Sequence, residues 1–131
     1  MNSIEQLTKE LRAIRAQLDV DSKFDHLFEI HTCPTHQGAM FLKLENDQYH
    51  ITWNERGTEI NRISTSESSE VLFQHTSQAI NEIVTTTSSG NPRPDISRQL
   101  ELMRKVNIEW AERVKADFLK YFPDEADDCL Y

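Results

Sequence analysis

The feature that most restricts the fold lies in the middle of the chain, where two short segments alternate apolar and polar residues on either side of a turn. The segments run from Met40 to Leu44 and from Tyr49 to Trp53, with Asn46-Asp47 between them. Successive side chains of a strand point to opposite faces of a sheet, so this period of two predicts two antiparallel strands joined by a tight hairpin. An isolated hairpin is marginally stable in water, and further elements must therefore cover one of its faces.

Two more strands are predicted around this hairpin. After Arg56-Gly57, where glycine adopts the positive φ of a turn at little cost, the segment Thr58–Ser64 continues the extended pattern. The segment Asp25–His31 carries Phe28 and Ile30 two positions apart, which favours a first strand before the hairpin. We therefore expect an α+β fold in which helices cover one face of an antiparallel meander of about four strands.

Helical periodicity begins at the N-terminus. Ser3 and Gln6 form a Ser-x-x-Gln capping box, which provides an acceptor for an unpaired N–H group of the first turn. The apolar residues that follow are spaced by three and four, as on one face of a helix. They are Ile4, Leu7, Leu11, Ile14 and Leu18. We expect a helix that ends near Leu18 and packs this face on the core rather than on a partner.

Two further helices are predicted after the strands. Thr65 or Ser66 caps the first, which runs to about Thr85. The second starts at Pro94-Asp95 and stops at Pro123, and its apolar stripe includes Trp110, which we therefore place in the core. We expect a single domain over residues 1–123, with an acidic C-terminal tail over residues 124–131.

The charge of the chain is negative and unevenly distributed. Asp and Glu number 22 against 14 Lys and Arg, a net charge of −8. Residues 44–83 contain seven acidic and two basic side chains, and residues 124–131 contain four acidic and none that are basic. This field repels nucleic acid and anionic membranes and attracts basic partners, so we expect neither nucleic acid nor membrane as a partner. A solvated surface that keeps the protein soluble is the alternative interpretation.

The remaining composition predicts a cytoplasmic protein. The sequence has no run of 18 apolar residues and no basic and apolar signal segment after Met1. Cys33 and Cys129 are distant from each other in the chain, which favours reduced thiols rather than a disulfide framework.

A cluster of side chains with metal-ligand chemistry precedes the hairpin. It consists of His26, His31, Cys33 and His36. Imidazole and thiolate are ligands that zinc prefers, but the spacing matches no established motif. On the expected strand, the first two histidines would also point to opposite faces. We therefore predict no metal site and no cofactor, and interpret these residues as an ordinary polar loop.

The sequence likewise lacks a convincing catalytic arrangement. Cys33 and His36 resemble a nucleophile and base, yet no glycine turn that would form an oxyanion hole surrounds them. His50 and Glu55 form a possible acid–base pair with nothing nearby to position a substrate. We therefore predict that the protein is not an enzyme.

The charged pair Glu55-Arg56 lies at the second predicted turn, directly before Gly57. One interpretation is a structural clamp, in which the arginine reaches back to a carboxylate or carbonyl. The other is a presented contact residue, because turns between rigid strands are good platforms for recognition. Both interpretations remain open at this point.

Two segments of the chain resemble the Immunity protein 63 family. The first combines Tyr49-His50-Ile51, Glu55-Arg56-Gly57 and Val71-Leu72-Phe73. The second lies within residues 98–113 and contains the longer motif Asn107-x-Glu109-Trp110-Ala111-Glu112-Arg113. The chain departs from the family pattern at Gln74, where an aromatic residue is usual, and at Ile108, where the family has proline. The resemblance extends over roughly half of the chain and does not include the region before Met40.

The resemblance implies a protein that binds a bacterial toxin specifically and thereby protects the cell that makes it. Such toxins include nucleases and other enzymes that modify nucleic acids, whose clefts are basic because phosphates bind there. We therefore expect steric and electrostatic occlusion of a toxin domain by a monomer or weak homodimer. The expected toxin-binding residues are Asp47, Glu55, Arg56, Glu59, Glu67 and Glu70. The alternative is an acidic secretion chaperone that holds an extended effector segment.

Overall fold

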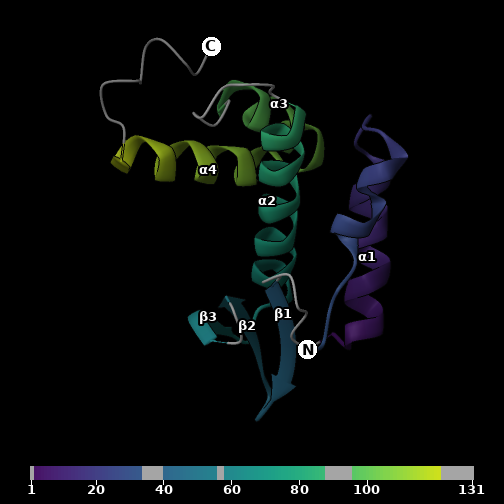
Figure 1. Ribbon diagram of the computed structural model, residues 1–131, viewed down its shortest axis with the longest axis vertical. Helices are drawn as coiled ribbons and strands as arrows, with labels where there is room; N and C mark the ends of the chain where they lie inside the picture. The colour runs from purple at the N-terminus through teal and green to yellow at the C-terminus, as the bar shows by residue number, and fades with distance from the viewer. Residues whose placement is uncertain (1, 34–39, 56–57, 88–95, 122–131) are drawn as a thin grey trace.

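A long central helix organises the molecule, with the sheet at its N-terminal end and two further helices towards its C-terminal end (Figure 1). The computed structural model describes residues 2–33, 40–55, 58–87 and 96–121. Its elements, in chain order, are α1 (Ile4–Ala16), the 3-10 helix η1 (Ser22–Phe28), β1 (Met40–Glu45), β2 (Gln48–Glu55), β3 (Thr58–Thr65), α2 (Ser68–Thr87), α3 (Ile96–Val106) and α4 (Ile108–Tyr121). Helix α1 lies alongside α2 (Figure 1). The expected α+β class is confirmed.

The sheet has three antiparallel strands in the order β1-β2-β3. Leu42 pairs with Ile51, and Ile51 pairs with Ile63, so the two predicted hairpins share one register of inward apolar residues. In the β1–β2 turn, Asn46 and Asp47 have φ values of 54° and 59°. Two consecutive positive φ values are typical of a type I′ turn, whose twist matches that of the flanking strands. The predicted hairpin is therefore confirmed.

The prediction of a strand over Asp25–His31 is wrong, because η1 occupies most of this segment and the described sheet has three strands rather than about four. The side chain of Asp21 accepts a hydrogen bond from the N–H of Lys23 at 2.9 Å and caps the 3-10 helix. Phe24 and Phe28 are both buried, and they reach the same cluster of apolar side chains from this one helix. Tertiary packing of two phenylalanines thus outweighs the local alternation.

The predicted last helix is interrupted at Asn107, so three helices rather than two follow the sheet within the described residues. The N–H of Asn107 still donates to the carbonyl of Met103, but its side-chain Oδ1 accepts from the N–H of Trp110 at 3.1 Å. An asparagine that bonds three residues ahead acts as an N-cap and starts a new helix. Helices α3 and α4 pack on each other, and α3 also packs on α2.

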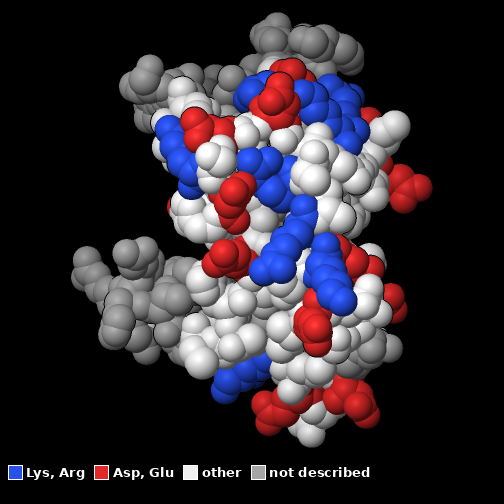
Figure 2. Space-filling model, turned by 90° about the vertical axis from the view of Figure 1, so that its right-hand side faces the viewer, with Lys and Arg blue, Asp and Glu red and all other residues white. Residues whose placement is uncertain are grey.

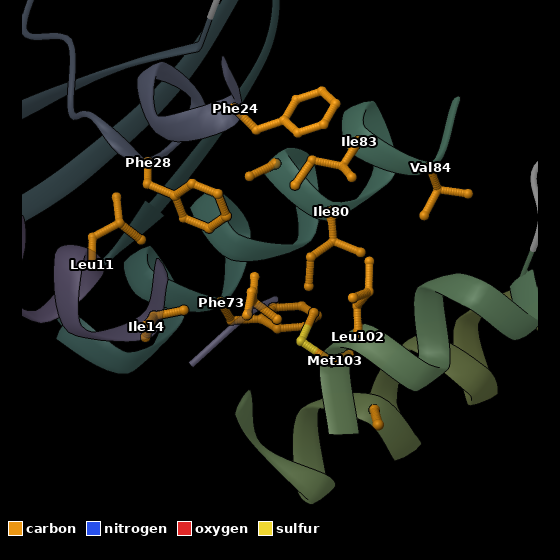
Figure 3. Close-up of a cluster of buried hydrophobic side chains, with 13 residues drawn as sticks. Leu11, Ile14, Phe24, Phe28, Phe73, Ile80, Ile83, Val84, Leu102 and Met103 are labelled. Atoms are coloured by element: carbon orange, nitrogen blue, oxygen red, sulfur yellow. The ribbon is translucent and has the colours of Figure 1, made fainter. Parts of the chain in front are cut away.

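The main core lies between α2 and its neighbours (Figure 3). The close-up shows side chains from α1, η1, α2 and α3 converging, and the labelled residues are Leu11, Ile14, Phe24, Phe28, Phe73, Ile80, Ile83, Val84, Leu102 and Met103. A second cluster joins the sheet to the helices through Leu7, Leu42, Tyr49, Ile51 and Val71, all fully buried. In the described ranges, no helix is both long and apolar enough to cross a membrane.

Candidate functional site

Three of the residues predicted to bind a partner lie at two opposite ends of the sheet. Asp47 lies in the β1–β2 turn, and Glu67 precedes α2 at the same end, because Tyr49 pairs with Thr65. Glu59 lies at the other end, in the first residues of β3. Tyr49 and Asn54, the partners of Thr65 and Glu59 on β2, are five residue steps apart, which span about 17 Å. The acidic residues of the meander therefore form two surfaces rather than one patch.

The first surface, the turn end, consists of Glu45, Asp47 and Glu67. All three side chains are exposed, and within the described ranges none has an ion-pair partner. Figure 2 shows acidic side chains at the lower tip of the molecule, the end at which Figure 1 places the β1–β2 turn. The turn end thus presents carboxylates that the described fold leaves available.

Tyr49 holds the backbone of the turn end in place. Its side chain is fully buried, and its hydroxyl donates a hydrogen bond to the carbonyl of Asn2. The same hydroxyl lies 3.2 Å from Oγ of Ser68, the first residue of α2. The carbonyl of Glu67 accepts from the N–H groups of Glu70 and Val71, which fixes Glu67 at the helix start. The sheet, the N-terminal segment and α2 therefore meet behind these carboxylates.

The second surface, the hairpin end, lies at the start of β3 and consists of Glu59 and Arg62. Arg62 is not among the binding residues predicted from the sequence. Oε1 of Glu59 accepts hydrogen bonds from Nε and Nη2 of Arg62 at 3.0 and 2.8 Å. Both side chains are about half exposed. Arg56 and the side chain of Glu55 lie outside the described residues, so the clamp and contact interpretations of that pair both remain predictions.

Glu70 is engaged inside the fold. Its two carboxylate oxygens accept from the Nη atoms of Arg113 at 2.6 and 2.8 Å, and Gln74 donates a further hydrogen bond at 2.9 Å. The bond from Arg113 lowers the pKa of Glu70, against the opposing effect of partial burial. The guanidinium also lies 4.0 Å from the ring centroid of Phe73. This carboxylate therefore joins α2 to α4.

The longer motif of the family resemblance lies at the same contact between α2 and α4. Asn107 caps α4, Ala111 is buried, and Trp110 packs edge-on against Phe73 with ring centroids 5.7 Å apart. Trp110 itself is half-buried at the margin of the main core, where we had predicted a core position. Most of the motif thus positions α4 on α2, a role that only the contact between distant segments reveals.

The histidine and cysteine residues before the sheet do not converge in the part of the chain that the structure describes. His26, His31 and Cys33 are exposed, and Nδ1 of His26 lies 2.8 Å from the carbonyl of Lys23. Among the described residues, no three His, Cys, Asp or Glu side chains come together as a metal site. His36 lies outside these ranges, so the absence of a metal stays a prediction.

The buried titratable residue His75 was not identified from the sequence. His75 on α2 is buried, and its Nδ1 lies 3.1 Å from the carbonyl of Val71. Desolvation lowers the pKa of His75, and the charge of His31 nearby lowers it further, against the opposing effect of the bond to Val71. In the sequence, the only indication of this buried histidine is its position on the apolar side of the predicted helix.

The described fold is that of a small α+β protein with exposed carboxylates at two ends of its antiparallel sheet. The sequence model of the family described as Immunity protein 63 matches residues 45–120, more than half of the chain. The chain belongs to this family, which has a role in immunity. No curated protein and no solved structure matches the chain.

Proposed function

We propose that this protein binds and neutralises a cognate bacterial toxin domain in the cytoplasm of the cell that makes the toxin. The observation that carries the proposal is the family match, which extends from Glu45 to Lys120 and so includes β2, β3, α2 and α3. Within this segment, Glu70 on α2 pairs with Arg113 on α4, so the ion pair joins these two helices. A toxin would meet a preassembled surface rather than separate segments.

The mechanism we propose is steric and electrostatic occlusion of a nuclease or another enzyme that modifies nucleic acid. The basic cleft of such an enzyme attracts a protein with a net charge of −8 and accepts carboxylates at phosphate positions. Asp47 and Glu67 at the turn end are the first candidates, since the described structure leaves them unpaired. Glu59 at the hairpin end is the second candidate, and Glu55 and Arg56 are proposed with it from the sequence alone.

Glu70 has an indirect role in the proposed binding. Its carboxylate is bound to Arg113 and is only partly accessible, with 24% of the side chain exposed. We propose that Glu70 supports the toxin-binding surface by fixing α4 on α2.

Co-expression tests the function directly. The toxic domain encoded immediately upstream is expressed in a bacterial host with and without this protein, and survival and co-purification are scored. Survival together with a stable complex supports immunity. Death of the host despite abundant soluble protein contradicts the proposal for that toxin.

Charge reversal tests the location of the surface. Asp47→Lys and Glu67→Lys alter the turn end, Glu59→Lys alters the hairpin end, and Asp19→Lys makes the same change in net charge at an exposed position near the other end of α1. Binding of the inactivated toxic domain by calorimetry should weaken by about tenfold or more for the turn-end variants, since truncating interface charges costs on the order of 2 kcal/mol. Equal effects of all four variants would indicate only long-range attraction.

The described surface also favours immunity over the secretion chaperone. A chaperone that holds an unfolded segment needs a continuous apolar groove. The exposed large apolar residues Leu44, Ile60 and Ile108 lie instead on three different elements, β1, β3 and α4.

A further inference from the structure

The two outer edges of the sheet differ in how they are covered. On β1, the N–H of Leu42 donates to the carbonyl of His31 at 2.8 Å, so the segment after η1 already occupies part of that edge. On the other side, β3 is the outermost strand, and in the described ranges no strand other than β2 pairs with it, so its outer edge is open (Figure 1). An edge strand with unpaired backbone groups is a template for another strand.

The register identifies which backbone groups of β3 point outward. In an antiparallel strand, the N–H and C=O of one residue point to the same side, and this side alternates along the chain. Because the N–H of Leu42 points away from β2, its partner Ile51 directs its own groups towards Ile63 on β3. The neighbours of Ile63, which are Arg62 and Ser64, therefore point their N–H and C=O groups outward.

A side-chain contact supports this assignment independently. The N–H of Arg62 donates to Oδ1 of Asn61 at 2.9 Å, and not to β2. By the same register, the N–H of Ser64 points away from β2, while its hydroxyl lies 2.7 Å from Nδ1 of His50 on the sheet face. Ser64 is therefore the position at which a partner strand would find a free donor.

The outer edge of β3 has only part of the usual protection against pairing. Proteins guard edges with proline, with charges, with short strands or with bulges, and β3 has a bulge. Here β3 has eight residues and no proline, and the charge of Arg62 is compensated by Glu59. The register shift opposite Trp53 and Asn54 leaves Ile60 as an extra residue, and 61% of its side chain is exposed. The bulge thus presents an apolar side chain beside the open edge.

We propose that the outer edge of β3 pairs with an extended strand of the toxin domain, which adds a strand to the sheet, and that Ile60 is the apolar contact beside it. This proposal rests on the proposed function, which supplies the partner. Charge argues for a basic partner rather than for a second copy, because two chains of net charge −8 repel each other. Glu67, two residues beyond β3, is exposed and fits a lysine or arginine that flanks the incoming strand.

Proline at Ser64 tests the proposal. Ser64→Pro removes the outward N–H and places a ring on the edge, but keeps the bonds of β3 to β2, since proline is tolerated on edge strands. Ser64→Ala is the matched control, because it loses only the hydroxyl. Both variants and the wild type are checked by circular dichroism and titrated with the inactivated toxic domain encoded upstream. We expect Ser64→Ala to bind as the wild type does and Ser64→Pro to bind at least about tenfold more weakly.

The outcomes separate this proposal from the proposed function. Failure of the wild type to bind refutes the proposed function, whereas unchanged binding by folded Ser64→Pro refutes strand addition alone. Hydrogen exchange of the wild type provides a measurement that does not depend on the variant. Protection of the Ser64 amide in the complex supports the pairing, and unchanged exchange overturns it. A dimer of the isolated protein that Ser64→Pro dissociates would also overturn it, because the edge would then bind a second copy.

Discussion

The ion pair between Glu70 and Arg113 should stabilise the fold more than an ordinary surface pair does. Two hydrogen bonds join the groups at 2.6 and 2.8 Å, with 24% of the Glu70 side chain and 42% of the Arg113 side chain exposed. Exposed pairs couple by about 0.2–1 kcal/mol, and a guanidinium over an aromatic ring adds about 0.5–1 kcal/mol. We therefore expect Arg113→Met to lower the free energy of unfolding by about 1–2 kcal/mol.

A double-mutant cycle isolates the pairwise energy. Glu70→Gln and Arg113→Met are measured singly and together by urea unfolding at neutral pH, and the coupling should be about 1 kcal/mol. The pair Glu59 and Arg62 is the internal control, since it also has two hydrogen bonds, but to a single carboxylate oxygen and with both side chains about half exposed. If Glu70 and Arg113 couple no more strongly than this control, the α2–α4 joint does not depend on the ion pair.

The same pair predicts a dependence on pH. Arg113 holds the pKa of Glu70 below its ordinary value of 4.5. A carboxyl whose pKa is lowered by folding contributes stability above its unfolded pKa, and this stability is lost as the pH falls through the folded pKa. The difference in stability between the wild type and Glu70→Gln should therefore be constant near neutral pH and shrink below pH 4.5. An unchanged difference in acid would contradict the assignment.

Three further predictions concern stability. Ile108 is the first residue of α4, after the cap Asn107, and is 70% exposed. Proline suits this position, so Ile108→Pro should raise the free energy of unfolding by about 0.4–1 kcal/mol in urea titrations, and a loss would contradict the cap. The hydroxyl of Thr76 is buried without a hydrogen-bond partner among the described residues, so Thr76→Val should stabilise by about 1 kcal/mol, seen as a higher melting temperature. Burial lowers the pKa of His75 below 6.5, so the unfolded chain binds protons first as the pH falls. The wild type should therefore lose stability relative to His75→Gln below pH 6.5, and parallel pH profiles would refute this.

Local sequence patterns predicted the elements whose geometry depends on near neighbours. The hairpin at Asn46-Asp47 formed as expected, because both residues tolerate a positive φ and the flanking alternation specifies the register. The cap at Ser3 also formed, with Oγ accepting from the N–H of Gln6 at 3.1 Å. The local alternation at Asp25–His31 did not give a strand, since the two phenylalanines of η1 gain more from the shared core than from a strand.

The sequence by itself determined the α+β class, the strong negative charge, most element positions and the family resemblance, all of which depend on composition and on neighbouring residues. Only the tertiary structure decided what the acidic residues can do. It separated Asp47 and Glu67 from Glu59 by the length of β2, and it paired Glu70 with a residue 43 positions away. It also left β3 at the edge of the sheet. These outcomes depend on how α2 brings distant segments together, which no local periodicity encodes.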